Sequence, residues 1–165
     1  MHIVPVETHR ERYRDLLLLA DEQWDMVERY LYRGDMFVLT EGGTGDANVD
    51  GFQPAPVFGC MVVTDEGVDT DGARVVEIKN LVVAPEAQRN GYGRMLIEFA
   101  ARCYATTNDV LQVGTGDSPL TLPFYEACGF VRSHVAPGFF LEHYDHPIIE
   151  EGVQLVDMVY LRREL

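Results

Sequence analysis

The run VVEIKNLVV, from Val75 to Val83, limits what this chain can fold into more than any other segment. Most of its residues are β-branched or apolar, which is typical of a buried strand. Gly91 and Gly93 follow after a short interval. Residues 93–106 then place apolar side chains at helical spacing, on a stripe of Met95, Leu96, Phe99, Ala100 and Cys103. The sequence therefore predicts a buried strand, a glycine-containing turn and an amphipathic helix in direct succession.

The remaining elements are predicted from the same two periodicities, the alternation of strands and the helical repeat. Strands are predicted over residues 2–6, 36–40, 57–64, 73–83, 109–114, 130–135 and 153–161. Helices are predicted over 7–20, 21–34 and 120–128, the second capped by Asp21 and ended by Gly34. Residues 42–56, rich in Gly, Asn, Asp and Pro, are predicted to form a flexible loop, and 65–72 an acidic turn.

The order of these elements predicts the fold class. It reads β-α-α-β-β-β-α-β-α-β-β, with a meander of successive strands followed by strands that join through helical crossovers. Such an order gives a mixed sheet with helices on its faces, an α/β (α+β) sandwich. Because the chain has 165 residues and no repeat or linker, we expect a single domain spanning residues 1–165.

Charge and composition narrow the classes of partner. The net charge of −14 repels nucleic acid and anionic membranes and attracts cations such as amines or basic peptides, although it also serves solubility alone. The chain starts without the pattern of a signal peptide and contains no apolar run of about 18 residues. Cys60, Cys103 and Cys128 lack CxxC spacing, which argues against a zinc site or a disulfide framework and favours buried thiols. We therefore expect a cytoplasmic protein without a metal.

The turn at Gly91 and Gly93 has the properties of an anion site. A helix that begins there presents backbone N–H groups without internal acceptors, and its dipole favours negative charge. Glycine lacks Cβ, so a bulky phosphate can approach the backbone, and Arg89 and Arg94 add positive charge. A P-loop is excluded because no Gly-Lys-Ser/Thr follows, and a Rossmann fingerprint because Leu96 occupies its third glycine position. A plain turn at the start of a helix remains the alternative.

Two motifs together identify a family. The stretch VVAPEAQRNGYGRML fits the pattern Gln/Arg-x-x-Gly-x-Gly/Ala after a strand, and PFYEACGF, from Pro123 to Phe130, fits Phe-Tyr-x-x-x-Gly-Phe on a later helix. They resemble the acetyl-CoA loop and the last helix of the GNAT superfamily of N-acetyltransferases. The likeness covers nearly the whole chain. Within the superfamily, the chain resembles a group of small bacterial acetyltransferases whose motifs imply no particular substrate. It implies a mostly antiparallel central sheet flanked by helices.

The resemblance also implies an acetyl-CoA site. In the family the loop amides bind the pyrophosphate of CoA, which corresponds here to Gln88, Arg89, Asn90, Gly91, Tyr92, Gly93 and Arg94. The backbone of the preceding strand, at Leu81, Val82 and Val83, would bind the acetyl carbonyl and the pantetheine arm. Ser118 matches a position that contacts the CoA arm, and it is also a reasonable helix cap.

Two side chains are candidates for the chemistry of acetyl transfer. Tyr125 matches a tyrosine that donates a proton to the departing sulfur, and the alternative is a tyrosine packed on the core. Glu77 lies four residues before Leu81, where one branch of the superfamily has a glutamate that takes the amine proton through water. A salt bridge with Lys79 or a neighbouring strand is the alternative for Glu77, and water without a dedicated base also suits this chemistry.

The predicted activity is acetyl transfer from acetyl-CoA to a primary amine by direct attack in a ternary complex. The alternative is a CoA-binding or acyl-CoA-binding sensor or interaction module without turnover. The acceptor, a small molecule or a peptide that we expect to be cationic, stays open. Residues 138–151 are the least explained: His143 and His146 lack the spacing of a helical zinc pair, and Phe139 and Phe140 could line an acceptor site or the contact of a homodimer.

Overall fold

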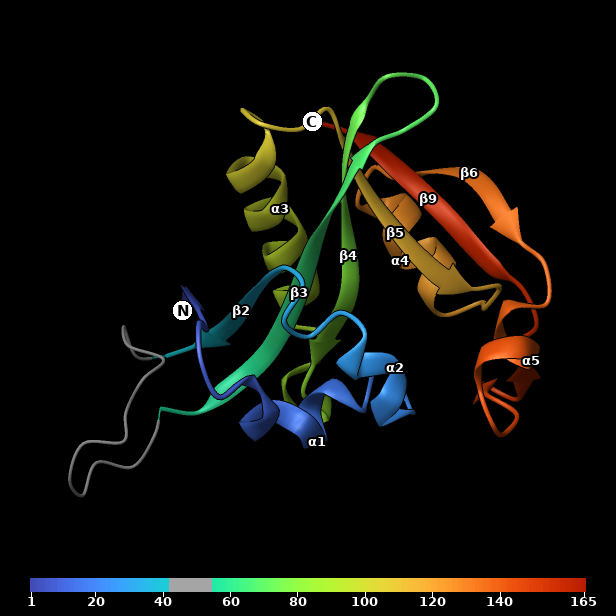
Figure 1. The fold of residues 1–165 in the computed structure, drawn as a ribbon. Helices are drawn as coiled ribbons and strands as arrows, with labels where there is room; N and C mark the ends of the chain where they lie inside the picture. The colour runs from blue at the N-terminus through green and yellow to red at the C-terminus, as the bar shows by residue number, and fades with distance from the viewer. Residues whose placement is uncertain (42–54) are drawn as a thin grey trace. The chain divides into compact units, whose positions relative to one another are not determined.

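The computed structural model describes residues 1–41 and 55–165. Seven strands form its larger sheet, in the order β1 (His2–Pro5), β2 (Asp35–Thr40), β3 (Val57–Val68), β4 (Arg74–Val83), β5 (Val110–Gly116), β9 (Met158–Glu164) and β6 (Val131–Ala136) (Figure 1). The pairs β1–β2, β2–β3, β5–β9 and β9–β6 are antiparallel, and β4–β5 is parallel. The predicted mixed, mostly antiparallel sheet is therefore confirmed. The loop predicted over 42–56 lies almost wholly outside the described residues.

The chain divides into two compact units. The first comprises Met1–Thr64 and Lys79–Cys103, and the second comprises Asp65–Ile78 and Tyr104–Leu165. Strands β3 (Val57–Val68) and β4 (Arg74–Val83) contribute residues to both units.

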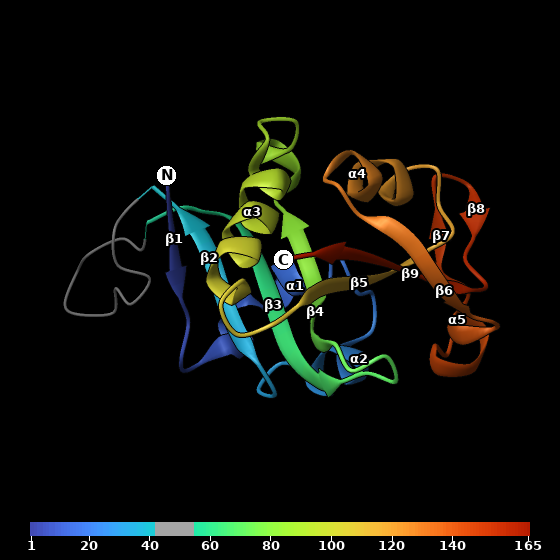
Figure 2. The ribbon, with the colours of Figure 1, turned by 90° about the horizontal axis from the view of Figure 1, so that it is seen from above.

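In the first unit, helices cover both faces of the strands. Strands β1 (His2–Pro5) and β2 (Asp35–Thr40) lie beside the first part of β3. The short helices α1 (Arg14–Leu17) and α2 (Trp24–Glu28) lie on one face, and α3 (Tyr92–Tyr104) lies on the other (Figure 2). Successive side chains of β2 point to opposite faces of the sheet. Met36 and Val38 pack in the core beneath α1 and α2, while the ring of Phe37 packs against that of Phe99 on α3, with 5.1 Å between the ring centroids.

The prediction of one continuous helix over residues 7–20 is wrong. A 3₁₀ turn, η1 (Arg10–Tyr13), precedes α1, which is only one turn long. Arg10 is buried, and its guanidinium donates to the carbonyls of Val6, Leu31 and Gly34. Three carbonyl acceptors fix this side chain, and with it the entry of the chain into the first unit.

The two residues predicted to bound the second helix have other roles. Gln23 is the N-cap residue of α2, and Asp21 instead accepts a hydrogen bond from the Tyr30 hydroxyl at 2.9 Å. Gly34 does not adopt a positive φ, so it is no left-handed cap. A Cβ at this position would lie 2.0 Å from the carbonyl oxygen of Val63, so close contact with β3 requires the glycine.

The apolar stripe of α3 is rotated from the predicted one. Leu96, Ile97, Ala100 and Ala101 are buried, whereas Met95 and Cys103 are exposed. The prediction of buried thiols therefore holds for Cys60 and Cys128 and is wrong for Cys103.

In the second unit, the first half of β4 pairs with β5 (Val110–Gly116), followed by β9 (Met158–Glu164) and β6 (Val131–Ala136). Helix α4 (Thr121–Ala127) lies over one face of these strands (Figure 2). Gly129 follows it with φ +87°, which matches the predicted stop. The core contains Leu111, Val113, Leu122 and Leu161, each at most 2% exposed.

The strand predicted over 153–161 is split. Val153–Gln154 forms β8, which pairs with β7 (Ile149–Glu150), and β9 begins only at Met158. Between them Leu155 packs with Phe140 of α5 (Phe139–His143) and with Ile148 in a small core of its own. The unexplained segment thus folds as a helical turn and a hairpin. Within residues 1–41 and 55–165, no helix is long and apolar enough to cross a membrane.

Candidate active site

The glycine loop begins where β4 ends. A 3₁₀ turn, η2 (Pro85–Ala87), leads to residues 88–91, and α3 starts at Tyr92. The backbone is left-handed at Arg89 (φ 63°) and at Gly91 (φ 78°). The carbonyl of Gly91 accepts the first bond of α3 from the N–H of Met95 at 3.0 Å. The N–H groups of Tyr92 and Gly93 therefore lie in the first turn, where an α-helix offers no internal acceptor.

The surroundings of Gly91 favour a ligand there. A Cβ at Gly91 would meet no described atom within 4 Å, so crowding by the chain does not explain the glycine. Its positive φ does favour glycine, and the open space lies next to the start of a helix, where an anion is stabilised. These residues therefore fit a phosphate group well.

Two side chains predicted to contact CoA hold the loop itself. The amide of Gln88 donates to the carbonyl of Val83 at 3.3 Å. The amide of Asn90 donates to the carbonyls of Ala87 at 3.1 Å and of Gln88 at 3.2 Å. Both amides therefore bind the backbone of the turn.

The strand before the loop leaves its neighbour early. The β4–β5 ladder covers four residue pairs, from Val75↔Val110 to Ile78↔Val113, although β4 continues to Val83. Leu81, Val82 and Val83 lie beyond this ladder. The side chain of Val82 packs in the first unit's core, so its backbone is the part that can serve a ligand.

Tyr125 lies on α4 and is only 7% exposed. Its ring packs against those of Phe124 at 5.1 Å and Phe130 at 5.7 Å. Burial raises the pKa of Tyr125 well above its ordinary value of 10, with smaller contributions from Cys128 and Glu150. The phenol therefore keeps its proton throughout the neutral range.

Ser118 is nearly fully buried and its hydroxyl has a local partner. Its Oγ accepts from the N–H of Leu120 at 3.1 Å, two residues further along the chain. Leu120, and not Ser118, is the N-cap residue of α4. Ser118 thus forms a serine turn before the helix, and the alternative considered from the sequence, a helix cap at Ser118, is wrong.

Glu77 is 6% exposed and belongs to the part of β4 that pairs with β5. Its Oε2 accepts a hydrogen bond from the Gln112 amide at 2.7 Å. The Gln112 Oε1 accepts in turn from Nε of Arg162 at 2.8 Å, and Arg162 contacts Asp69 at 2.7 Å. The alternative considered from the sequence is a salt bridge with Lys79 or a neighbouring strand, and Gln112, a partner of Oε2, lies on the neighbouring strand β5.

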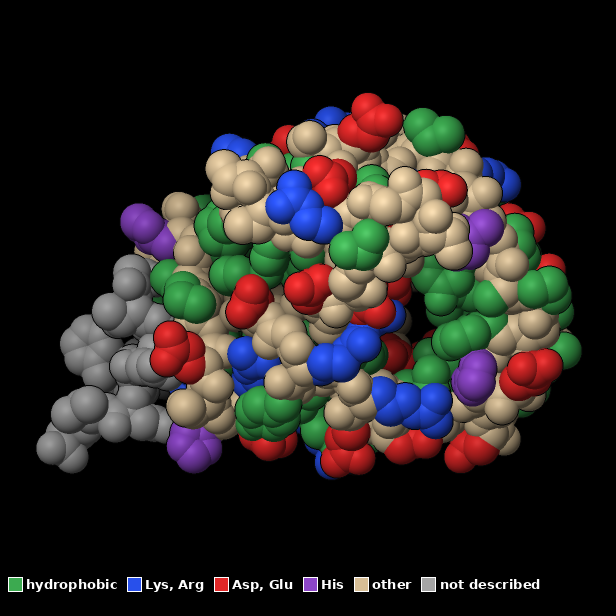
Figure 3. Space-filling view, turned by 45° about the horizontal axis from the view of Figure 1, so that its top comes forward, with side chains coloured by type: hydrophobic (Ala, Val, Ile, Leu, Met, Phe, Trp, Pro, Cys, Tyr) green, Lys and Arg blue, Asp and Glu red, His purple; other side chains and the backbone are tan. Residues whose placement is uncertain are grey.

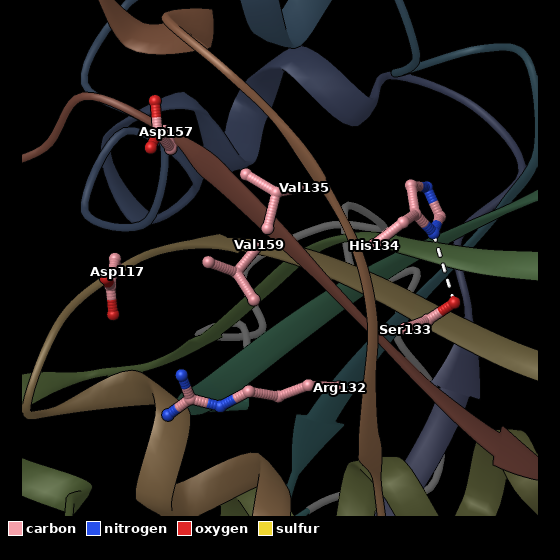
Figure 4. Close-up of a pocket in the computed structure, with 7 residues that line it drawn as sticks. All are labelled: Asp117, Arg132, Ser133, His134, Val135, Asp157 and Val159. Atoms are coloured by element: carbon pink, nitrogen blue, oxygen red, sulfur yellow. Dashed lines mark hydrogen bonds between the residues drawn. The ribbon is translucent and has the colours of Figure 1, made fainter.

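A hollow of about 170 Å³ lies beside β6 and β9 in the second unit. Figure 4 shows Asp117, Asp157 and Arg132 around Val135 and Val159, with the Ser133–His134 pair on the other side. Two of its charged groups have partners, since Arg132 binds Glu126 at 2.9 Å and Asp157 accepts from the Gly138 N–H at 2.8 Å. None of the predicted site residues lines it.

No group of three or more His, Cys, Asp or Glu residues able to hold a metal ion occurs within 1–41 and 55–165. The first unit contains the backbone N–H groups at the start of α3. The second unit contains a buried carboxyl group, at Glu77, and a buried phenol, at Tyr125.

A family model described as an acetyltransferase (GNAT) domain matches residues 32–132. The chain belongs to the GNAT acetyltransferase family. It is 34% identical over 161 residues to YvbK of Bacillus subtilis (strain 168), an uncharacterized N-acetyltransferase, covering 96% of this chain and 92% of that protein. The predicted N-acetyltransferase is thus confirmed at the level of the family.

Two solved structures of GNAT proteins share the fold over nearly their whole lengths. A GNAT family acetyltransferase from Elizabethkingia anophelis, with acetyl-CoA bound, has a TM-score of 0.82 at 28% identity and covers 99% of this chain and 97% of its own. A Bacillus subtilis acetyltransferase in complex with CoA has a TM-score of 0.78 at 32% identity, with coverage of 99% and 98%.

Sequence reasoning missed the partners of Glu77. Gln112 is the polar residue in the middle of the apolar strand that includes VLQV, and Arg162 lies in the last strand. A polar side chain inside a predicted buried strand signals that it has a partner, because burying it unpaired is costly. The identity of that partner depends on which strands are neighbours.

Proposed function

We propose that this protein transfers the acetyl group of acetyl-CoA to a primary amine by direct attack in a ternary complex. The observation that carries the proposal is the loop at Gly91, where open space, a left-handed glycine and the start of α3 coincide. This is the arrangement expected for a bound pyrophosphate. The GNAT relatives with acetyl-CoA or CoA bound support that ligand.

Each predicted residue would have a defined part. Backbone N–H groups of residues 88–94 would bind the pyrophosphate, and Arg89 and Arg94 would add charge at its edges. The β4 backbone at Leu81, Val82 and Val83, outside the β4–β5 ladder, would hold the pantetheine arm and polarise the acyl carbonyl. Acetyl-CoA supplies a thioester whose carbonyl carbon is open to attack by an amine. Ser118 would contribute a turn near the CoA arm.

The protons need a base and an acid. An amine attacks only in its neutral form, so Glu77 would accept its proton through a water molecule. The new C–N bond forms as the C–S bond breaks, and Tyr125 would hydrogen-bond the departing sulfur and give it a proton. Because burial raises the pKa of Tyr125, the phenol would carry its proton before the reaction begins.

The acceptor is inferred to be a cationic small molecule or a basic peptide. The net charge of −14 favours a cation. Figure 3, however, shows acidic and basic side chains interspersed over the face that it presents, so a single acidic patch does not dominate that face. A cytoplasmic location, a single catalytic domain and the possibility of a homodimer complete the proposal.

Release of free thiol from acetyl-CoA over a panel of amines tests this function. Polyamines, amino sugars, amino acids and basic peptides represent the acceptor classes, and each product is identified by its added acetyl mass. Thiol release with at least one amine is expected. Stabilisation by acetyl-CoA without turnover on any amine would favour the CoA-binding module instead, and equal stabilisation by ATP would overturn the CoA site.

A further inference from the structure

A hydrogen-bonded chain of polar side chains, buried at Glu77 and Gln112 and partly exposed at Arg162 and Asp69, crosses three strands of the second unit. It starts at Asp69 in the turn between β3 and β4, passes through Arg162 on β9 and Gln112 on β5, and ends at Glu77 on β4. Its donor–acceptor distances are 2.7, 2.8 and 2.7 Å, within the range of well-formed hydrogen bonds. Gln112 and Glu77 are each 6% exposed.

The chemistry of the members fixes the direction of this chain. A guanidinium only donates, so the Gln112 amide must turn its oxygen to Arg162 and its NH₂ to Glu77. The NH₂ group only donates, so Oε2 of Glu77 accepts from it. The order of donors therefore fixes one orientation of the Gln112 amide.

Asp69, at the end of the hydrogen-bonded chain opposite Glu77, is also held in place. Oδ2 of Asp69 binds Arg162, while its Oδ1 accepts the backbone N–H groups of Asp71 at 2.9 Å and Ala73 at 3.0 Å. The backbone bond from Ala73, and then Arg162, lower the pKa of Asp69, which keeps it charged. The β3–β4 turn thus holds Arg162 in place, and Arg162 holds the amide.

We propose that Gln112 is a positioning residue, which acts on the reaction by holding the Glu77 carboxylate, with Arg162 and Asp69 fixing the orientation of its amide. The inference rests on the proposed function, in which Glu77 accepts the amine proton. The strand register pairs Glu77 with Gln112, and Gln112 with Arg162. The three residues therefore lie in one row across the neighbouring strands β4, β5 and β9. Tyr160 and Glu66 are further titratable groups near this site, since Glu77 and Glu66 both raise the pKa of Tyr160 after burial.

A double-mutant cycle tests whether Gln112 acts through Glu77. Gln112→Met preserves length and removes both ends of the amide, and it should lower kcat about tenfold with the KM for acetyl-CoA unchanged. Once Glu77→Gln has removed the carboxylate, adding Gln112→Met should cost no further activity. Arg162→Met, which leaves Gln112 and Glu77 in place, should lower kcat in the same direction and to a smaller extent.

Asp109→Asn is the matched control. It breaks an exposed pair with Arg74 that also links β4 to the start of β5, and kcat should stay at the wild-type value. Additive losses in the cycle, or a Gln112→Met protein with reduced Tm and wild-type kcat, would overturn the positioning role. A raised KM for the amine with unchanged kcat would also overturn it and make Gln112 a substrate contact.

A spectroscopic readout separates this inference from the proposed function. The side-chain NH₂ resonances of Gln112 should move in ¹H–¹⁵N spectra of Glu77→Gln and Arg162→Met, and stay in place in Asp109→Asn. If the Gln112 resonances do not shift in Glu77→Gln, the hydrogen-bonded chain is refuted, irrespective of the measured acetyltransferase activity. Resonances that respond, in a protein that acetylates no amine, would instead reject the proposed function and the catalytic role of Gln112 while keeping the chain itself.

Discussion

The glycine loop and the Glu77 site differ in how their residues are brought together. The loop is formed by consecutive residues, it is largely exposed, and its amide side chains at Gln88 and Asn90 bind its own backbone. The Glu77 site is buried, and it joins side chains from β4, β5 and β9. The first therefore depends on backbone conformation, and the second on which strands are neighbours. We expect changes in the loop to affect ligand binding and changes among the buried side chains to affect turnover.

The largest effect should come from a buried side chain. Tyr125→Phe removes one hydroxyl and keeps the packing of the ring against Phe124 and Phe130. If the hydroxyl protonates the departing sulfur, kcat should fall on the order of 10²-fold, as is typical for loss of a general acid. Steady-state rates and acetyl-CoA titrations measure the two quantities, and the Kd should not change. Wild-type turnover would leave Tyr125 as a core residue only.

The loop should respond in binding instead. Gly91→Val places a β-branched residue at φ 78° and a side chain in the open space above the turn. Acetyl-CoA affinity should fall about tenfold or more, and the left-handed backbone should cost about 1–2 kcal/mol of stability. Calorimetric titration and thermal unfolding measure both.

Gly67→Val is the matched control for that change. Gly67 has φ 76°, and a Cβ added there would likewise meet no described atom within 4 Å, but the residue lies in β3 and belongs to the second unit, whereas the loop belongs to the first. Its stability loss should equal that of Gly91→Val, while acetyl-CoA binds as in the wild type. Equal losses of affinity in both variants would mean that strain, and not the loop, governs binding.

A smaller effect is expected from the loop's own scaffold. Gln88→Ala removes the bond to the Val83 carbonyl and leaves every backbone group in place. Because this bond is long and exposed, the loss should be about 0.5–1 kcal/mol in acetyl-CoA binding. A loss as large as that of Gly91→Val would show that the Gln88 side chain itself binds the ligand.

The smallest effect, a change in stability, should appear at the exposed Arg74–Asp109 pair. This pair belongs to neither the glycine loop nor the Glu77 site, so its substitution tests a surface charge alone. Hydrogen bonds from the Arg74 side chain and backbone lower the pKa of Asp109 from 3.8 to about 2. A lowered pKa stabilises the fold above the unfolded-state value, and that contribution is lost as the pH falls through the folded-state value. Asp109→Asn should therefore be slightly less stable near pH 7, and the difference should vanish between about pH 4 and pH 2. Thermal unfolding at a series of pH values checks this.

The glycine loop could be predicted from the sequence because its determinants are local. Val83, Gly91 and the start of α3 are close together in the chain, so a strand, a left-handed turn and a helix start can be recognised in order. The succession of most strands and helices along the chain could also be anticipated, since alternation and helical spacing are local signals. The exposed position of Cys103 shows the limit, because a helix stripe that is one residue out of phase exchanges buried and exposed positions.

Tertiary structure alone decided the features that depend on distant residues. Glu77 meets Gln112 and Arg162 only because β4, β5 and β9 are adjacent, and Gly34 is required only because β3 passes within contact of it. The last predicted strand is interrupted because Leu155 gains burial against Phe140 and Ile148. A buried polar or apolar group takes the partner that the sheet order provides, and that order is set by the free energy of the whole fold and not by any one segment.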